Sequence, residues 1–147
     1  MLRDTLRNRT RAQHARLEER LEIERRVRQR DAYVDLLKRF YGFYVQIEPR
    51  LAAFARTFEA HGIDLAERSR VARLRRDLIA LGERAVALPG ADPVPEISTF
   101  PQAVGCLYVL EGSTLGAQVI LKCIRASSGL DSENGAAFFS GYGASTG

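Results

Sequence analysis

A histidine near the start of the chain lies among residues that could orient it for chemistry. His14 is followed four residues later by Glu18 and preceded seven residues earlier by Arg7. On a helix these spacings put all three side chains on one face. A carboxylate there can accept the second N–H of an imidazole and orient the ring, and a neighbouring cation can meet an anionic group. The arrangement suits a histidine that ligates a metal.

The kind of metal site is limited by the other ligands available. Zinc takes three or four protein ligands, which this chain does not offer. Cys106 and Cys123 would lie roughly 25 Å apart on one helix, so neither a disulfide nor a cysteine metal site is expected, and both should be small buried apolar residues. A single imidazole backed by a carboxylate suits an axial ligand to haem iron. The alternatives are that His14 is an ordinary surface residue and that His61 caps a helix end.

A second candidate feature is an apolar, helical segment at 107–118 that contains two glycines. Gly112 and Gly116 share a helix face with Gly105, two turns earlier. Each glycine in a helix interior costs about 0.5–1 kcal/mol relative to alanine, so the pattern requires a reason. Bare backbone predicts either close packing of another helix or a flat, bulky ligand. Packing is the simpler interpretation when the segment is taken alone, and His14 shifts the balance towards a ligand.

Helical periodicity dominates the rest of the chain, and no segment alternates like a strand. We therefore predict an all-α fold, a compact helical bundle that forms a single domain over residues 1–147. Its expected parts are a helix at 6–21; one from a cap at Asp31 to His61, kinked or divided by Pro49 and stopped by Gly62; one started by Asp64 and ended before the proline-rich segment 89–95; one capped by Thr99 and running to about Ala126; a short apolar anchor at 136–139; and a glycine-rich end at 141–147.

Composition narrows the class of protein. With 46% hydrophobic and 27% charged residues, the chain is typical of a globular domain and not of a disordered one. A membrane span needs roughly 18–20 apolar residues, and we expect no segment of this chain to form one. The first residues do not show the apolar core of a secretory signal. A cytoplasmic protein with no membrane contact is the expectation. Acidic residues flank the arginine runs at 25–30 and 68–76, which favours solvated, paired helix faces over a nucleic-acid site.

Four motifs occur in one order along nearly the whole chain. They are TRAQH at 10–14 with Leu17 and Glu18, FYGFY at 40–44, LYVLEGSTLGAQ at 107–118 and FFSGYG at 138–143. Each is weak alone, and the Glu-Gly-Ser-x-Leu-Gly-Ala part is the most specific. As an ordered set they resemble the haem oxygenase family, in its bacterial, biliverdin-producing type that accompanies phytochromes.

The resemblance implies roles on both sides of a haem. His14 would be the proximal iron ligand, Glu18 its supporting carboxylate and Arg7 a contact to a haem propionate. Gly112 and Gly116 would be the distal-helix glycines that let the backbone cross closely over the haem. The remaining assignments are Tyr108 as a haem contact and Ser113, which replaces the acidic residue of animal-type enzymes and, with Thr114 or backbone, would hold water for proton delivery.

The resemblance also implies an activity and partners. Haem, as both substrate and cofactor, would be cleaved with dioxygen to biliverdin, carbon monoxide and iron, with electrons from a ferredoxin or reductase and a bacterial phytochrome as recipient of the product. Family members continue past the Gly-Tyr-Gly loop into a helix with further basic contacts to the propionates. Because the sequence stops at Gly147, we expect either a bundle that lacks that helix or a chain truncated before it. The alternative function is a non-catalytic module that binds haem or a bilin.

Overall fold

The structure is a computed structural model that describes residues 2–84 and 94–143, and every regular element in these ranges is a helix. The prediction of an all-α fold is confirmed. Most of the proline-rich segment and the last four residues of the glycine-rich end lie outside the described residues. The elements are α1 (Leu2–Leu21), α2 (Ile23–Arg26), α3 (Arg30–Ala52), α4 (Ala55–Ala60), the 3-10 turn η1 (Ala66–Arg68), α5 (Val71–Ala80), α6 (Phe100–Ser128) and α7 (Ala137–Ser140).

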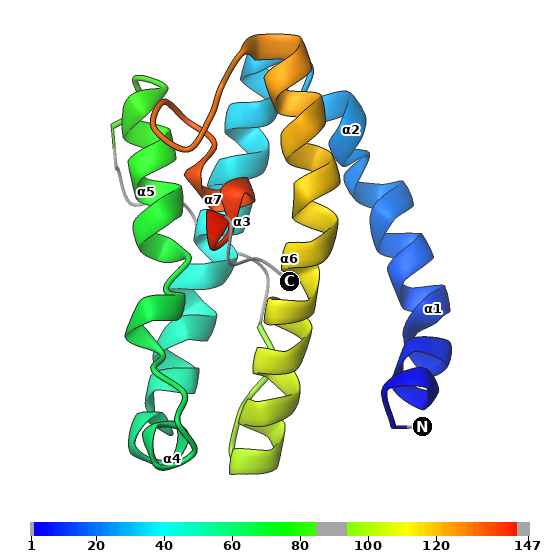
Figure 1. Cartoon of the computed structure of the whole chain (residues 1–147), viewed down its shortest axis with the longest axis vertical. Helices are drawn as coiled ribbons and strands as arrows, with labels where there is room; N and C mark the ends of the chain where they lie inside the picture. The colour runs from blue at the N-terminus through cyan, green and yellow to red at the C-terminus, as the bar shows by residue number, and fades with distance from the viewer. Residues whose placement is uncertain (1, 85–93, 144–147) are drawn as a thin grey trace.

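The core forms where α3, α5, α6 and the short α7 meet (Figure 1). Helix α3 packs on α5, while α7 fills the space between α5 and α6. Fully burying one large apolar side chain is worth about 1.5–3 kcal/mol, so this cluster is the main source of stability. Its most deeply buried members include Tyr33, Leu36, Leu37, Ile47, Leu74, Leu78, Ile124, Ala136 and Phe139.

The long helix expected between Asp31 and His61 is two helices. Helix α3 begins two residues earlier than predicted, at Arg30 after the cap residue Gln29, so Asp31 lies in its first turn and is not its cap. Pro49 lies inside α3, and the chain leaves the helix only after Ala52. The break places Phe58 of α4 fully buried in a second apolar cluster with Leu51, Ala103 and Leu107. This tertiary contact sets the division, because a proline near a helix end removes only one hydrogen bond.

The start of α5 also differs from the prediction. Asp64 accepts a hydrogen bond from the Ala66 amide at 2.8 Å and starts the short turn η1, not the main helix. Helix α5 begins at Val71, where the Glu48 carboxylate accepts the amides of Arg70 at 2.5 Å and Val71 at 3.1 Å. A carboxylate at this position satisfies orphan N–H groups and complements the helix dipole. The cap therefore comes from α3, which no local pattern could indicate.

Helix α6 matches its prediction to within two residues at each end. The Gln102 side chain accepts the Thr99 amide at 3.1 Å, as in a capping box, and Pro101 stands in the first turn. The helix ends at Gly129, whose φ of 70° is the left-handed conformation that favours glycine at this position.

The length and composition of α6 correct one expectation. Among the described helices it alone is long and apolar enough to cross a membrane, with a mean hydropathy of 1.4 over an 18-residue window. Only 18% of that window is buried. The same window contains Glu111, whose carboxylate pairs with Arg68 and Arg70 on the bundle side. Helix α6 is therefore packed on one side and apolar on the other, and the uncovered side is the part that requires an explanation.

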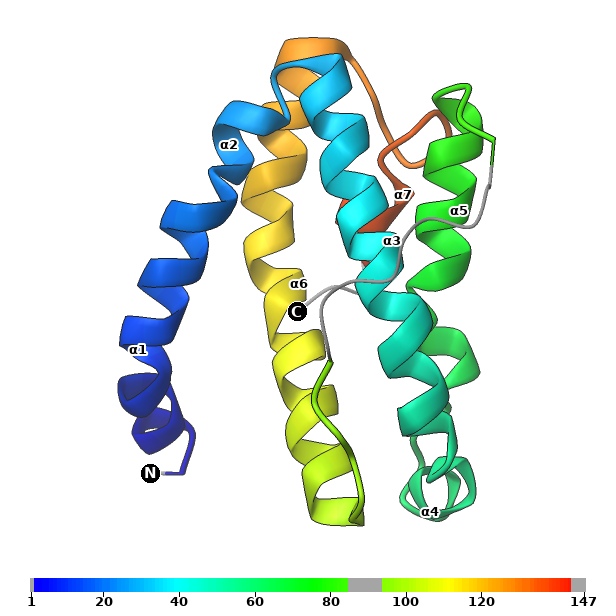
Figure 2. The same cartoon turned by 180° about the vertical axis from the view of Figure 1, so that it is seen from behind.

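Helix α1 stands apart from the bundle. In Figures 1 and 2 it leads away from α2 and diverges from α6 towards its N-terminus. From Asp4 to Arg20 every side chain is exposed except the half-buried Thr10. The junction residue Glu22 has a φ of 42°, and it is the one non-glycine residue with positive φ in the described chain. Such a conformation costs a non-glycine residue roughly 1–2 kcal/mol, so the turn between α1 and α2 is strained.

Candidate functional site

The glycines of α6 face open space. Gly105, Gly112 and Gly116 are all exposed, and a Cβ atom built on any of them would meet no atom within 4 Å. The interpretation that another helix packs closely here is therefore wrong for the described structure. Because an unpacked glycine in a helix costs stability without a structural return, the stripe favours a ligand.

Large apolar side chains border the glycines. Tyr108 is 51% exposed, Val109 58% and Val119 56%. Helical spacing puts them beside the glycine positions, and the opposite side of α6 is buried in the bundle. Soluble proteins rarely leave such contiguous apolar surface uncovered unless it binds something. This surface, here called the open face, consists of Val104, Gly105, Tyr108, Val109, Gly112, Gly116 and Val119.

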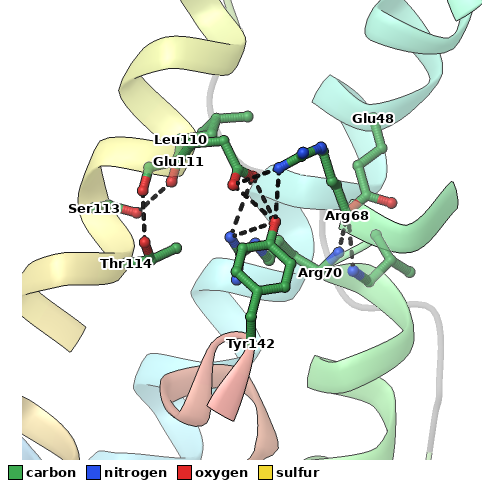
Figure 3. Close-up of polar contacts among 9 residues, drawn as sticks. Glu48, Arg68, Arg70, Leu110, Glu111, Ser113, Thr114 and Tyr142 are labelled. Atoms are coloured by element: carbon green, nitrogen blue, oxygen red, sulfur yellow. Dashed lines mark hydrogen bonds and ion pairs between the residues drawn. The ribbon is translucent and has the colours of Figure 1, made fainter. Parts of the chain in front are cut away.

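Two hydroxyl groups follow the first glycine of the pair. Ser113 is exposed and donates to the Leu110 carbonyl at 2.7 Å, while the buried Thr114 donates to the Glu111 carbonyl at 2.7 Å (Figure 3). Each hydroxyl proton is thus used within the helix, as is common for helical serine and threonine. The Ser113 oxygen keeps lone pairs that can accept a hydrogen bond from water.

A buried tyrosine lies behind Ser113. Burial raises the pKa of Tyr44 to about 12, with the nearby Arg70 cation and the Ser113 hydroxyl acting in the opposite direction. The phenol of Tyr44 therefore keeps its proton throughout the neutral range and is available as a hydrogen-bond donor. The sequence motif at 40–44 drew attention to this stretch, but it did not link Tyr44 to Ser113.

Glu111 lies at the centre of a polar cluster that the sequence reasoning missed. Its carboxylate oxygens lie 3.0 Å from Arg68 Nη1 and 3.3 Å from Arg70 Nη2. The Tyr142 hydroxyl donates to the same carboxylate at 2.8 Å (Figure 3). Arg70 is almost completely buried, with 5% of its side chain exposed. The one available signal was a lone acid in an apolar helix segment, since such a charge needs a partner.

Tyr142 is also held through its ring. The guanidinium carbons of Arg68, Arg70 and Arg73 lie 5.8, 5.1 and 4.9 Å from the ring centroid, within cation–π range. Burial and the hydrogen bond to Glu111 raise the pKa of the Tyr142 hydroxyl. Burial and the Arg70 charge lower the pKa of Arg73. The cluster fixes the Gly-Tyr-Gly loop against α6 at Glu111, which directly precedes Gly112.

The three α1 residues of the sequence hypothesis are accessible. Arg7, His14 and Glu18 are all exposed. In the described part of the chain, no hydrogen bond or ion pair joins His14 to Glu18, and α1 does not pack on the open face. The structure thus keeps the expected helical spacing within α1 but does not bring the two sides of the expected site together. Their roles stay predictions.

A hollow of the described structure lies elsewhere, away from the open face. It has a volume of about 430 Å³ and is bordered by Arg73 and Arg76 of α5, by Gln118 and Arg125 of α6, and by Ser140 of α7. Helical geometry puts Gln118 and Arg125 on nearly the opposite side of α6 from the glycines. The hollow is therefore not the expected haem site.

Cys106 and Cys123 form no disulfide, as expected, but both are half-buried and not fully buried. His61 is the C-terminal cap of α4, with Nδ1 2.7 Å from the Thr57 carbonyl oxygen, which confirms its structural role. No group of three potential metal ligands occurs in the described ranges.

The arginine runs are partly paired, as predicted: Arg25 pairs with the neighbouring Glu22, while other arginines find partners elsewhere in the fold. Arg26 binds Asp35 at 3.1 Å and Arg76 binds Glu133 at 2.5 Å. Asp77, the acidic residue that follows the second run, is fully buried and accepts two amides of α7. Some pairs thus follow the proximity of charges along the chain, and others follow the tertiary fold.

The protein is an all-α bundle in which one face of α6 is left open by glycines. Comparison with known proteins identifies the family to which such a bundle belongs here. Residues 1–145 match the family model described as heme oxygenase, and the chain therefore belongs to the haem oxygenase family. The chain is similar to the heme oxygenase of Xanthomonas campestris pv. campestris (strain 8004), with 34% identity over 96 residues. That match covers 65% of this chain and 54% of the relative, so it spans about half of the relative's length. No solved structure matches the chain.

Proposed function

We propose that the chain binds haem between α1 and the open face of α6 and cleaves it oxidatively to biliverdin, carbon monoxide and iron. The observation that carries this proposal is the open glycine stripe, exposed and unpacked in a member of this family. The reaction consumes dioxygen and electrons from an external donor. Membership of the family supports the proposal that the protein acts on haem. The glycine stripe supports the proposed position of haem on α6.

The open face suits a haem macrocycle in shape and in polarity. Haem is flat, wide and largely apolar, and it requires a surface without projecting side chains at its centre. Glycines at 105, 112 and 116 leave open space where Cβ atoms would stand, and Tyr108, Val109 and Val119 offer apolar contact around them. Covering this surface would remove the exposed apolar area that makes α6 unusual.

The proximal side would come from α1. His14 would ligate the iron through one ring nitrogen, and Glu18 would accept the N–H of the other, which fixes the tautomer. Arg7 would meet a propionate. All three side chains are exposed and available. Binding in this way requires α1 to approach α6, and the turn at Glu22 is the natural place for that movement.

Haem, when bound, supplies both the iron that activates dioxygen and the porphyrin that is oxidised. The chain's own residues then bind, orient and control water. Gly112 and Gly116 admit the macrocycle close to the backbone. Ser113 would accept a hydrogen bond from a water bound beside the haem, and the protonated phenol of Tyr44 would be a hydrogen-bond donor nearby. Direct proton transfer by an acidic side chain is not part of this proposal, because serine occupies that position.

Partners and location belong to the same proposal. We propose a ferredoxin or reductase as electron donor, a bacterial phytochrome as recipient of biliverdin, and the cytoplasm as location. The motif resemblance supports these assignments. Contact with a membrane or with nucleic acid is not part of the proposal.

A second candidate function is a module that binds haem or a bilin without turnover. The observation that favours it is the separation of α1 from the open face, which leaves the site unenclosed. A wet site binds an apolar ligand less tightly and protects oxidised intermediates less well. The two functions differ only in turnover, so one experiment separates them.

The experiment is a haem titration of the wild type, His14→Ala and His61→Ala, followed by addition of a reductant in air. The wild type and His61→Ala should show the absorption spectrum of a histidine-ligated haem, and His14→Ala should lose it. Formation of biliverdin, seen by its absorption, supports the enzyme, whereas stable haem binding without biliverdin supports the module. Unchanged ligation in His14→Ala would overturn the assignment of the ligand.

A further inference from the structure

We propose that Glu111 is a positioning residue, which sets the rotation of α6 so that Gly112 and Gly116 face the haem. The inference rests on the proposed function for its consequence but on the described contacts for its geometry. The assembly of Glu111, Arg68, Arg70 and Tyr142 is here called the Glu111 clamp.

Because Glu111 lies next to Gly112, the position of its side chain determines the direction in which the glycine stripe faces. Glu111 directly precedes Gly112, and successive residues of a helix project about 100° apart. Holding the Glu111 carboxylate on the bundle side therefore turns Gly112 and Gly116 outward. Any rotation of α6 that moved the stripe would pull Glu111 from its partners.

The clamp connects parts of the fold that otherwise make little contact. Helix α6 packs on α2, α3 and α7, whereas in the described ranges α5 and α6 make at most a slight direct contact. Arg68 and Arg70 precede α5 and reach across 43 and 41 residues to Glu111. Tyr142 adds the C-terminal loop, 31 residues away. Two segments distant in the sequence, residues 68–70 and the loop with Tyr142, thus converge on one carboxylate of α6 beside the stripe.

The ion pairs of the Glu111 clamp restrict the rotation of α6. Arg70 is almost fully buried, and its guanidinium has no carboxylate other than Glu111 among the ion pairs of the described residues. A buried cation requires a partner, so Glu111 is held where it is by more than packing. Apolar contacts on the other sides of α6 would tolerate a small rotation, whereas the paired, hydrogen-bonded carboxylate would not.

The first test needs no haem. Glu111→Gln keeps the shape of the side chain and removes its charge. Glu133→Gln is the control, because Glu133 likewise pairs with an arginine, Arg76 of α5, but is not part of the Glu111 clamp. Amide hydrogen exchange should become at least about tenfold faster at residues 109–116 than at 120–126 in Glu111→Gln, and it should stay unchanged in Glu133→Gln. A uniform change, or none, would overturn the proposal.

The second test measures the distal side of the haem complex. Azide binding to the ferric complex, followed by absorption, should change about fivefold or more in Glu111→Gln and less than twofold in Glu133→Gln, while histidine ligation is kept. If Glu111→Gln does not fold, Tyr142→Phe and Arg68→Gln weaken the clamp more mildly. If the wild type binds no haem, the proposed function fails and hydrogen exchange alone decides on the clamp. Unchanged azide affinity in a haem-binding, folded variant contradicts it.

Discussion

Asp77 of α5 lies fully buried and accepts the backbone amide of Ala137 at 2.7 Å, at the first residue of α7. Its second oxygen accepts the Phe138 amide at 2.8 Å. One carboxylate therefore satisfies two N–H groups of a helix that is too short to be stable alone. This contact fastens the segment that carries Tyr142 onto the bundle.

The burial of Asp77 predicts a pH-dependent stability. Burial raises the pKa of Asp77 from 3.8 to about 6, partly offset by the two amides. The folded protein thus binds this proton more tightly than the unfolded chain, so the stabilisation is present below about pH 4 and is lost as the pH rises through 6. The difference corresponds to roughly 3 kcal/mol. Urea unfolding should show the wild type losing stability relative to Asp77→Asn between pH 4 and 7; a pH-independent difference would contradict this.

The open face predicts opposite effects of one substitution on stability and on ligand binding. Gly116→Ala introduces a methyl group into open space and should raise the free energy of unfolding by about 0.5–1 kcal/mol. The same methyl group should weaken haem binding at least about tenfold, because it stands between backbone and ligand. The comparison variant is Gly129→Ala, where φ is 70° and a side chain should destabilise. Equal haem affinity for Gly116→Ala and the wild type would exclude the stripe as the haem surface.

The carboxylate that caps α5 predicts a purely structural effect. Glu48→Ala should lower the free energy of unfolding by about 1–2 kcal/mol, because two amides at the start of α5 lose their acceptor. Glu59→Ala, at an exposed position in α4, should change it by less than about 0.5 kcal/mol. Chemical unfolding of both variants measures the difference, and equal values would show that the cap is unimportant.

The strained junction predicts that a glycine is stabilising there. Glu22→Gly should raise the stability of the wild type by up to about 1 kcal/mol, because glycine adopts a φ of 42° without steric cost. The lost ion pair with Arg25 is exposed and contributes little. Glu24→Gly, two residues later within helix α2, should instead destabilise by about 1 kcal/mol. Thermal unfolding by circular dichroism distinguishes the two signs.

The features that could be predicted from the sequence are those that neighbouring residues determine, such as the ends of helices. The start of α6 at Thr99, its end near Gly129 and the stop at Gly62 follow from local backbone chemistry, and the structure confirms them. The glycine pattern also identified the face of α6 that stands open. It could not show whether that face was packed, because packing depends on where the other helices lie.

The rest depends on contacts between distant residues. The break after Ala52 is set by the burial of Phe58, and the start of α5 is set by a carboxylate 22 residues earlier. Glu111 finds its arginines more than 40 residues away. Pairing across such distances leaves no period or motif in the sequence, so only the fold reveals it.

The left-handed turn at Glu22 has a thermodynamic consequence for any ligand that α1 helps to hold. Such a ligand must bring a 20-residue, solvent-covered helix to rest against α6, and the free energy of that step is part of its apparent affinity. Affinity and residence time are then properties of the junction as well as of the binding surface. Residues that never touch the ligand, such as those at 21–23, can therefore tune how long it stays.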